Sequence, residues 1–279
     1  MSYKDLLVHL DGTDAARTRG ECAIALAAAW NAHLTGLCLM AEPVIPPMLG
    51  IAIGADVLER QRAETAAAGA AILAQFEAAA APAGIAIESR FEMAPVDTLP
   101  RRFARHARHV DLSIIGQPPA NNGVDETMLA EAAFLETGRP ALLIPYIGAR
   151  EFPPRRILVA WDGGREAARA IGDALPFLRR ADEVSLIVVD PAALSERIGA
   201  EPGADMARHL ARHDVKVTVR AVATGGLAVG DVLLGEAADG AADLLVMGGF
   251  GHSRLRELVL GGVTRHLIEH MTVPVLLAH

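Results

Sequence analysis

The sequence predicts an α/β protein with two tandem, doubly wound sheets of five parallel strands each. Two observations carry this prediction. An alternation of strands and helices, β-α-β-α-β-α-β-α-β, occurs twice in the 279 residues. Both halves also open alike, because the apolar runs at residues 6–10 and 157–161 are followed by Asp-Gly, at Asp11 and Asp162. Since consecutive parallel strands need a crossover connection, helices between them indicate sheets that are covered on both faces.

The elements of the first half follow from hydrophobic periodicity and from its punctuation by glycine and proline. Short apolar or alternating runs are expected strands, and Ala-rich runs with helical spacing are expected helices. The expected strands are residues 6–10, 34–40, 85–92, 111–116 and 140–144, and the expected helices include 17–31, 55–80 and 97–107. Pro43 follows the second strand, and residues 44–54 are expected to form an extended loop.

The second half repeats this pattern, with Pro191 in the place of Pro43. Its expected strands are residues 157–161, 184–189, 215–222, 243–248 and 274–277, and its expected helices are 165–179, 192–213 and 229–238, with another that begins near Gly262. Residues 148–154 contain two adjacent prolines and are the expected linker. We therefore expect one domain at residues 1–148 and a second at residues 154–279.

Composition and charge narrow the class of protein. The formal charge of -8 opposes binding to nucleic acid or to an anionic membrane, because a phosphate backbone requires a basic surface. The two cysteines, Cys22 and Cys38, have neither metal nor redox spacing. The N-terminus lacks the apolar stretch of a signal peptide, and we expect no apolar run of membrane-spanning length. These observations favour a soluble protein of the cytoplasm.

A glycine-rich stretch at residues 247–265 is typical of an anion-binding loop. An apolar strand ends at Gly248, and the helix expected near Gly262 presents N–H groups without intrahelical partners, which favour an anion together with the helix dipole. Glycine also lets the backbone approach an anion without a Cβ clash. Positively charged or basic side chains follow at His252, Arg254, Arg256 and Arg265. The alternative interpretation is a purely structural glycine-rich turn.

The spacing of these glycines resembles the universal stress protein family, and the repeated halves resemble a tandem member of that family. The family motif is Gly, two residues, Gly, nine residues, Gly and then Ser or Thr, and Gly248, Gly251 and Gly261 fit it. The resemblance implies a fold like the adenine nucleotide α-hydrolases, with strand order 3-2-1-4-5, and an ATP site in the second half, with Mg²⁺. The implied adenine and ribose contacts are Ala160, Asp162, Val188 and Met247, and the implied phosphate contacts are Gly248, Gly251, Gly261, Gly262, Val263 and Thr264.

The resemblance also implies that the two domains pair through their last strands as an internal pseudo-dimer, and that two chains associate as a homodimer.

Two departures from the family motif change what we expect of ligand binding. Gly262 stands where the family has Ser or Thr. Because a neutral hydrogen bond contributes about 0.5–1.5 kcal/mol net, we expect weakened ATP binding. In the first half Gly116 is followed by Gln117, Pro118 and Pro119, and proline removes N–H donors. We therefore expect one ATP per chain.

The Asp-Gly pairs at the two strand ends have two interpretations. A carboxylate there can bind a ribose hydroxyl or a phosphate-bound metal ion, or it can cap the following helix. We expect ligand contact at Asp162, where the glycine motif is present, and a cap at Asp11. His209 and His213, four residues apart, are expected on a solvated helix face rather than at a metal site. The basic run at residues 101–109 is also expected to be solvated, and its alternative role is to dock an acidic partner.

Catalytic motifs are weakly represented. The two lysines, Lys4 and Lys216, do not follow a glycine-rich loop, which excludes a Walker A site. The sequence has no Gly-x-Ser-x-Gly elbow, and residues 162–166 only faintly echo the serine-rich loop of adenylating enzymes. We expect an ATP-binding regulatory protein of the stress response, with little or no catalysis and with no catalytic or metal-ligating residues. The alternatives are a nucleotide-free interaction scaffold and a slow ATPase or adenylating enzyme.

Overall fold

The computed structural model describes residues 2–43, 55–118, 124–149, 152–198, 201–249 and 262–279. A ten-stranded sheet runs through these residues in the order β3-β2-β1-β4-β5-β10-β9-β6-β7-β8. The strands are β1 (Asp5–Leu10), β2 (His33–Ala41), β3 (Ile87–Ala94), β4 (Leu112–Gly116), β5 (Ala141–Ile144), β6 (Arg156–Ala160), β7 (Glu183–Val189), β8 (Val217–Val222), β9 (Leu244–Gly248) and β10 (Val275–Ala278). Within each half the strands are parallel and follow the order 3-2-1-4-5, which confirms the predicted fold class.

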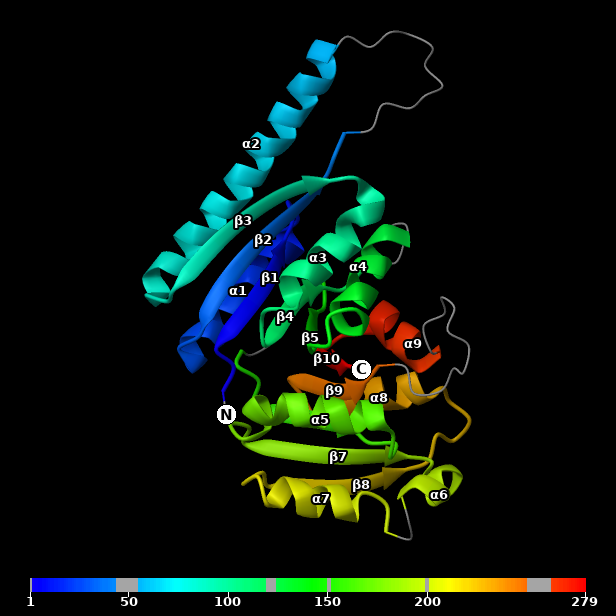
Figure 1. Cartoon of the computed structure of the whole chain (residues 1–279). Coiled ribbons are helices and arrows are strands. Elements are labelled where there is room, and N and C mark those ends of the chain that lie inside the picture. Colours follow the sequence, from blue (N-terminus) through cyan, green and yellow to red (C-terminus); the bar gives the residue numbers. More distant parts are fainter. Residues whose placement is uncertain (1, 44–54, 119–123, 150–151, 199–200, 250–261) are drawn as a thin grey trace.

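Helices cover both faces of this sheet (Figure 1). They are α1 (Asp14–Trp30), α2 (Ala55–Ala80), α3 (Leu99–Ala107), α4 (Val124–Leu135), α5 (Arg165–Leu178), α6 (Ser195–Ile198), α7 (Ala204–Ala211), α8 (Val229–Asp239) and α9 (Gly262–His270). The buried side chains of α1, α2, α5 and α7 belong to one core cluster, and those of α3, α4, α8 and α9 belong to another. Two helices per face in each half are what a doubly wound sheet requires.

The two halves meet where β5 pairs with β10, the one antiparallel pairing among the described strands. Leu142 lies opposite Leu276 in this register. Pro140 and Pro274 stand directly before the two strands, where the missing N–H of proline interrupts no ladder bond within the strand. The predicted pairing of the halves through their last strands is therefore present within one chain.

The hydrophobic core also crosses the boundary between the halves. The ring of Tyr3 makes edge contacts with Trp30 of α1, at 4.9 Å between centroids, and with Phe177 of α5, at 5.7 Å. The hydroxyl of Tyr3 donates to the carbonyl of Asp173 in α5. Buried aromatic pairs contribute about 0.5–1.5 kcal/mol beyond the area that they bury. The halves are therefore held by side-chain packing as well as by strand pairing.

One predicted helix is divided. The sequence predicts a continuous helix over residues 192–213, but the structure has a 3₁₀ turn at Pro191–Leu194, the short α6 and then α7. Gly203 stands at the start of α7 with φ 79°, a backbone conformation that glycine adopts without a steric penalty. Apolar periodicity alone does not detect a break that the Pro202-Gly203 pair makes.

The expectation about membrane-spanning segments also needs correction. The helical segment Asp56–Ala83, 28 residues long with mean hydropathy 1.2, could cross a membrane by length and composition alone. Its apolar character comes mainly from alanine, which raises hydropathy without adding a large side chain. Leu73, Phe76 and Ala80 of this segment are buried in the core, and α2 lies along β3 (Figure 1). The predicted loop at residues 44–54 lies outside the described residues.

Candidate functional site

The second half contains a cavity of about 670 Å³ at the carboxyl ends of β6, β7 and β9. Ligand sites of open parallel sheets lie at this edge, where the strand order reverses beside the first strand of the unit. The cavity is lined by Ala160, Trp161, Asp162, Glu166, Ala167, Ile187, Val189, Asp190, Ala193, Leu194, Ala228, Val229, Gly230, Leu233, Met247, Gly248, Gly262, Val263, Thr264 and His266. Its volume lies within the range of about 300–1,000 Å³ that is typical of small-molecule sites.

The cavity brings together most of the predicted contact residues. Ala160, Asp162, Met247, Gly248, Gly262, Val263 and Thr264 all line it. Gly251 and Gly261 lie outside the described residues, as do His252, Arg254 and Arg256. Arg265 does not line the cavity, because its side chain is exposed and pairs with Glu269 one turn along α9, at 2.8 Å.

Val188 is placed differently from the prediction. The side chains of Ile187 and Val189 line the cavity, but that of Val188 does not. Successive side chains of a strand point to opposite faces, and Val188 lies near Gly203 on the other face of β7. The resemblance to the family therefore places the correct strand end at the cavity, and the side chains that it presents are those of the two neighbouring residues.

The sequence predicts that glycine at the end of β9 lets the backbone approach an anion, but Gly248 is also required for packing between a helix and a strand. A Cβ atom at this position would lie 2.5 Å from the backbone nitrogen of Ala167. The first turn of α5 therefore packs directly against the end of β9. Gly248 both lines the cavity and allows this close approach between helix and strand.

The carboxylate of Asp162 also has two roles. Its Oδ1 atom accepts a hydrogen bond from the backbone N–H of Gly164, at 2.8 Å, which fixes the turn between β6 and α5. Gly164, rather than Asp162, is the N-cap residue of α5. Asp162 also lines the cavity, so the turn holds its carboxylate at the cavity wall.

The first residues of α9 form the opposite side of the cavity. Gly262, Val263 and Thr264 line it, and Thr264 is buried. The first N–H groups of an α-helix have no intrahelical acceptor, and the helix dipole adds partial positive charge at the same end. An anionic group in the cavity would therefore be favoured near the start of α9.

Three ionisable residues of the cavity were not predicted from the sequence. Glu166 lies at the start of α5, where burial would raise its pKa, but the hydrogen bond and charge of Arg165 lower the pKa below its ordinary value. The pKa of Asp190 is lowered by hydrogen bonds from the backbone and hydroxyl of Thr224. His266 lies 2.7 Å from a carboxylate oxygen of Asp231, which joins α9 to α8. Their partners lie far along the chain or outside any motif, so sequence spacing could not reveal them.

The corresponding region of the first half is closed by its own side chains. Arg19 is buried, and its guanidinium donates to a carboxylate oxygen of Asp11 at 2.7 Å and to the carbonyl of His9 at 2.7 Å. Burial would raise the pKa of Asp11, but the charge of Arg19 and hydrogen bonds from Thr13 and Arg19 lower it to about 2. The guanidinium also fills the space beside Gly116, since a Cβ atom there would lie 2.2 Å from it.

The predicted helix cap at Asp11 is wrong in detail. The N-cap of α1 is Thr13, whose hydroxyl accepts from the N–H of Ala16 at 3.1 Å. Asp11 instead accepts from the backbone and hydroxyl of Thr13. Its carboxylate therefore orients the capping residue rather than capping the helix itself.

The other candidate sites are structural. The rings of His209 and His213 contact each other edge-on, and His213 lies 3.2 Å from the guanidinium of Arg179. Within the described part of the chain no group of three potential ligands could hold a metal ion. In the basic run, Arg102, Arg105 and His106 all contact the carboxylate of Glu92 on β3. The expected solvated face is therefore partly neutralised by a carboxylate from the neighbouring strand.

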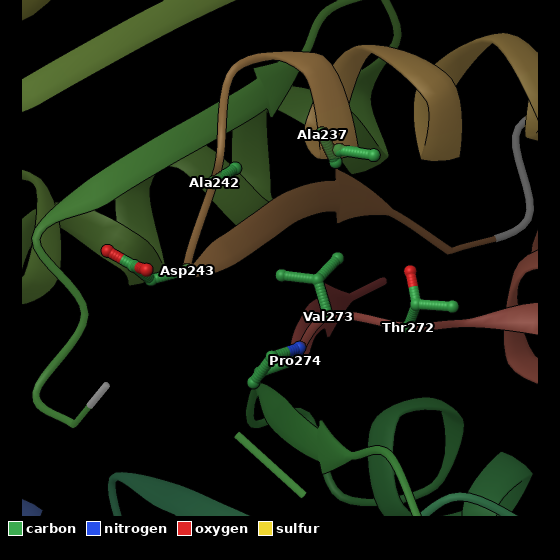
Figure 2. A pocket seen from close by; sticks show the side chains of 7 residues that line it. Ala237, Ala242, Asp243, Thr272, Val273 and Pro274 are labelled. Carbon is green, nitrogen blue, oxygen red and sulfur yellow. The ribbon is translucent and has the colours of Figure 1, made fainter. Parts of the chain in front are cut away.

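A second cavity lies at the opposite edge of the sheet, before the starts of β9 and β10 (Figure 2). Its lining includes Asp243, Thr272 and Pro274, and its volume is about 30 Å³. That volume holds a single water molecule rather than a metabolite. Asp243 already accepts from the backbone N–H of Arg155 and Arg156, which attaches the linker to the start of β9. This cavity is therefore not a nucleotide site.

Comparisons with known proteins agree with this architecture. Residues 154–279 match the family model described as the universal stress protein family. The chain matches no curated protein in sequence. Among solved structures it is similar to a universal stress protein from Archaeoglobus fulgidus DSM 4304, with 16% identity, a TM-score of 0.72 and coverage of 98% of this chain and 95% of that one.

Another similar structure is that of a putative universal stress protein from Pseudomonas aeruginosa UCBPP-PA14, with 17% identity, a TM-score of 0.63 and coverage of 99% and 93% of the two chains. At this level of identity the two structures show a shared fold that extends over both halves. The match to the family model is confined to the half that contains the cavity. Residues 154–279 therefore match the universal stress protein family in sequence, and the whole chain shares the fold of these two solved structures.

Proposed function

We propose that the second half of the chain binds ATP with Mg²⁺, one molecule per chain, in the cavity between β6, β7, β9 and α9. The observation that carries the proposal is that Asp162 and the first residues of α9 line a single cavity of about 670 Å³. A carboxylate suits a ribose hydroxyl or a metal ion, and a helix start suits phosphate. The buried residues Ile187 and Met247 offer apolar surface to a planar base.

The charges of the cavity support the inclusion of a divalent cation. Asp162, Glu166 and Asp190 line it, whereas no lysine or arginine does so among the residues that the structure describes. A triphosphate placed near three carboxylates would be repelled unless a cation neutralised part of its charge. The proposed contacts remain Ala160, Asp162, Met247, Gly248, Gly251, Gly261, Gly262, Val263 and Thr264, with Ile187 and Val189 in place of the side chain of Val188.

The proposed role is regulatory. Nucleotide occupancy changes a surface that partners recognise, with little or no catalysis. The unit that binds is the domain at residues 154–279, and the domain at residues 1–148 binds no triphosphate because Arg19 and Asp11 satisfy each other. The proposal further includes a cytoplasmic location, where ATP and magnesium are available, and association of two chains.

The test is calorimetric titration of the full chain with ATP and MgCl₂, beside Gly262→Val and Gly172→Val variants. A Cβ atom at either glycine meets nothing within 4 Å among the residues that the structure describes, so both variants are expected to fold. Only Gly262 lines the cavity, where the added side chain occupies ligand space. We expect one ATP per native chain, the same for Gly172→Val, and at least tenfold weaker binding for Gly262→Val.

Three results would contradict the proposal or a part of it. Absence of binding to native protein that is shown to be free of nucleotide would favour the interaction scaffold. Equal affinity in native protein and in a folded Gly262→Val variant would place the nucleotide elsewhere. Steady ATP turnover would instead favour an enzyme, and the carboxylate–imidazole pair of Asp231 and His266 would then be the first candidate for a general base.

A further inference from the structure

The helix α9 connects the cavity with the first half of the chain. Its first residues, Gly262 to Thr264, line the cavity. Its last residues lie against the first half, because the carbonyl oxygens of Ile268 and Glu269 both accept from the side chain of Gln117. Figure 1 shows α9 at the boundary between the two halves. One short helix therefore contacts both the candidate ligand site and the other half.

Gln117 follows directly after β4 and is 7% exposed. Its Nε2 atom donates to the carbonyl of Ile268 at 3.0 Å and to that of Glu269 at 3.2 Å. The last carbonyl groups of a helix have no intrahelical donor, so a side chain that reaches them acts as a C-terminal cap. The cap of α9 is thus supplied by a residue more than half the chain away in sequence.

The oxygen of the same amide faces a different segment. Oε1 of Gln117 accepts from the backbone N–H of Tyr146, at 3.2 Å. Tyr146 and Ile147 follow β5 and are 58% and 64% exposed, so they form an apolar corner on the surface of the first half. The end of α9 and this 146–147 corner are joined through a single buried amide whose donor and acceptor atoms are both bound.

Side-chain packing reinforces this connection. Leu267 and Ile268 of α9 belong to the same buried cluster as Ala130 and Phe134 of α4 in the first half. Protein interiors are close-packed, so a helix held on one side cannot shift without displacing the groups that it contacts. In the second half α9 is tied to α8 by His266 and Asp231.

We propose that Gln117 couples the cavity to the 146–147 corner. A ligand that orders the start of α9 fixes the position of its last carbonyl groups, and Gln117 transfers that position to the backbone of Tyr146. Gln117 is a positioning residue, since it does not line the cavity. The inference rests on the proposed function for the identity of the ligand, whereas the link between α9 and the corner is independent of that identity. Such coupling is reciprocal, so a partner bound at the corner would change the affinity for nucleotide by the same factor.

The first experiment measures amide hydrogen exchange of the full chain with and without ATP and MgCl₂. In native protein we expect the ligand to slow exchange in residues 141–149 by about fivefold, the lower end of measured couplings. The Gln117→Glu variant keeps the acceptor for Tyr146 but replaces the donor to α9 by a carboxylate, so this slowing should disappear while ATP still binds. The exposed Gln75 of α2 supplies the control Gln75→Glu, which should behave as native protein does.

The second experiment needs no nucleotide. Asp231→Ala removes the tie between α8 and α9 without touching Gln117 or the 146–147 corner. We expect faster exchange in residues 141–149 of this variant, and no such increase when the same change is made in the Gln117→Glu background. Asp205→Ala, at an exposed ion pair of α7, is the matched control.

The outcomes separate this inference from the proposed function. If native protein binds ATP and exchange in residues 141–149 does not change, the coupling is overturned and the nucleotide site stands. If native protein does not bind ATP, the proposed function fails and the Asp231→Ala cycle decides the coupling alone. Equal effects of Asp231→Ala in both backgrounds would overturn it, because Gln117 would then carry none of the connection.

Discussion

The guanidinium of Arg19 lies 2.7 Å from the carboxylate of Asp11, and its side chain is only 3% exposed. Arg19 is the sixth residue of α1, and the sixth residue of α5 is the small, buried Ala170. The aspartate after the first strand therefore meets a permanent internal cation in the first half, and in the second half it lines a cavity. The two halves share a fold, and this residue of the first helix contributes to the difference in charge between their equivalent edges.

Asp11→Ala should destabilise the protein by about 3 kcal/mol at pH 7, because it leaves a buried arginine without its carboxylate. The pKa of Asp11 is lowered to about 2, below its unfolded value. Its contribution is therefore present above about pH 4 and is lost as the pH falls toward 2. Urea unfolding at pH 7 and near pH 2 measures the difference. A destabilisation of equal size at both pH values would contradict the assignment, and an Arg19→Met/Asp11→Ala double variant should recover part of the loss at pH 7.

His9 makes the fold sensitive to mild acid. Burial, the largest cause, and the charge of Arg19 together lower its pKa to about 4, while the charge of Asp11 opposes this shift. Because the folded pKa lies below the unfolded value, stability is complete above about pH 6.5 and falls as the pH decreases toward 4. Between pH 7 and pH 5 the loss should be about 2 kcal/mol. His9→Leu should reduce this loss, whereas substitution of the exposed His109 should not, as chemical unfolding at both pH values would show.

Glycines along the cavity should differ in their tolerance of a side chain. At Gly248 an added methyl group would lie 2.5 Å from the backbone of Ala167, so Gly248→Ala should cost about 1–3 kcal/mol in unfolding free energy. At Gly262 an added methyl group meets nothing within 4 Å in the described part of the chain, so Gly262→Ala should change stability by less than about 0.5 kcal/mol. Thermal unfolding of the two variants is the measurement. A more destabilised Gly262→Ala would mean that α9 begins differently from the structure.

Magnesium should control nucleotide affinity. With three carboxylates in the described lining of the cavity, ATP without a divalent cation should bind at least tenfold more weakly than Mg²⁺–ATP. Asp162→Asn should reduce the ratio of the affinity for Mg²⁺–ATP to that for ATP alone, because it removes one of the repelling charges and one candidate metal ligand. Titration in EDTA and in MgCl₂ measures both effects. An unchanged ratio in Asp162→Asn would exclude a role for this carboxylate near the phosphates.

The fold and the position of the site could be predicted because both depend on local patterns. Apolar runs that end in Asp11 and Asp162 mark the first strand of each half, and the glycine motif that begins at the end of β9 marks the edge at which the cavity lies. Parallel topology then brings the remaining strand ends to the same edge. Strand bounds differ from the prediction by a few residues at most, since the ends of hydrophobic runs are not sharp.

The charges of the site could not be predicted, because they depend on contacts between distant segments. Arg19 appears as one charge in an Ala-rich helix, and only the packing of α1 places it beside Asp11. Asp231 and His266 are similarly joined by the meeting of α8 and α9. The family resemblance implies Val188 as a contact because it identifies a strand end, and a shift of one residue along a strand reverses the face to which a side chain points. Contacts between side chains of distant segments leave no pattern in the spacing of residues along the sequence.

Joining the halves in one polypeptide releases them from the constraint of symmetry. In a homodimer related by a two-fold axis, each side of the contact must use the same residue. Here Gln117 follows β4 and holds the end of α9, whereas its counterpart Gly249 follows β9 and leaves room for Phe134 of α4, whose ring would lie 2.7 Å from an added Cβ. Each side of the boundary has been free to specialise alone. A substitution at this boundary changes only one side of the contact. One half can therefore become a sensor, and the other half can respond to it.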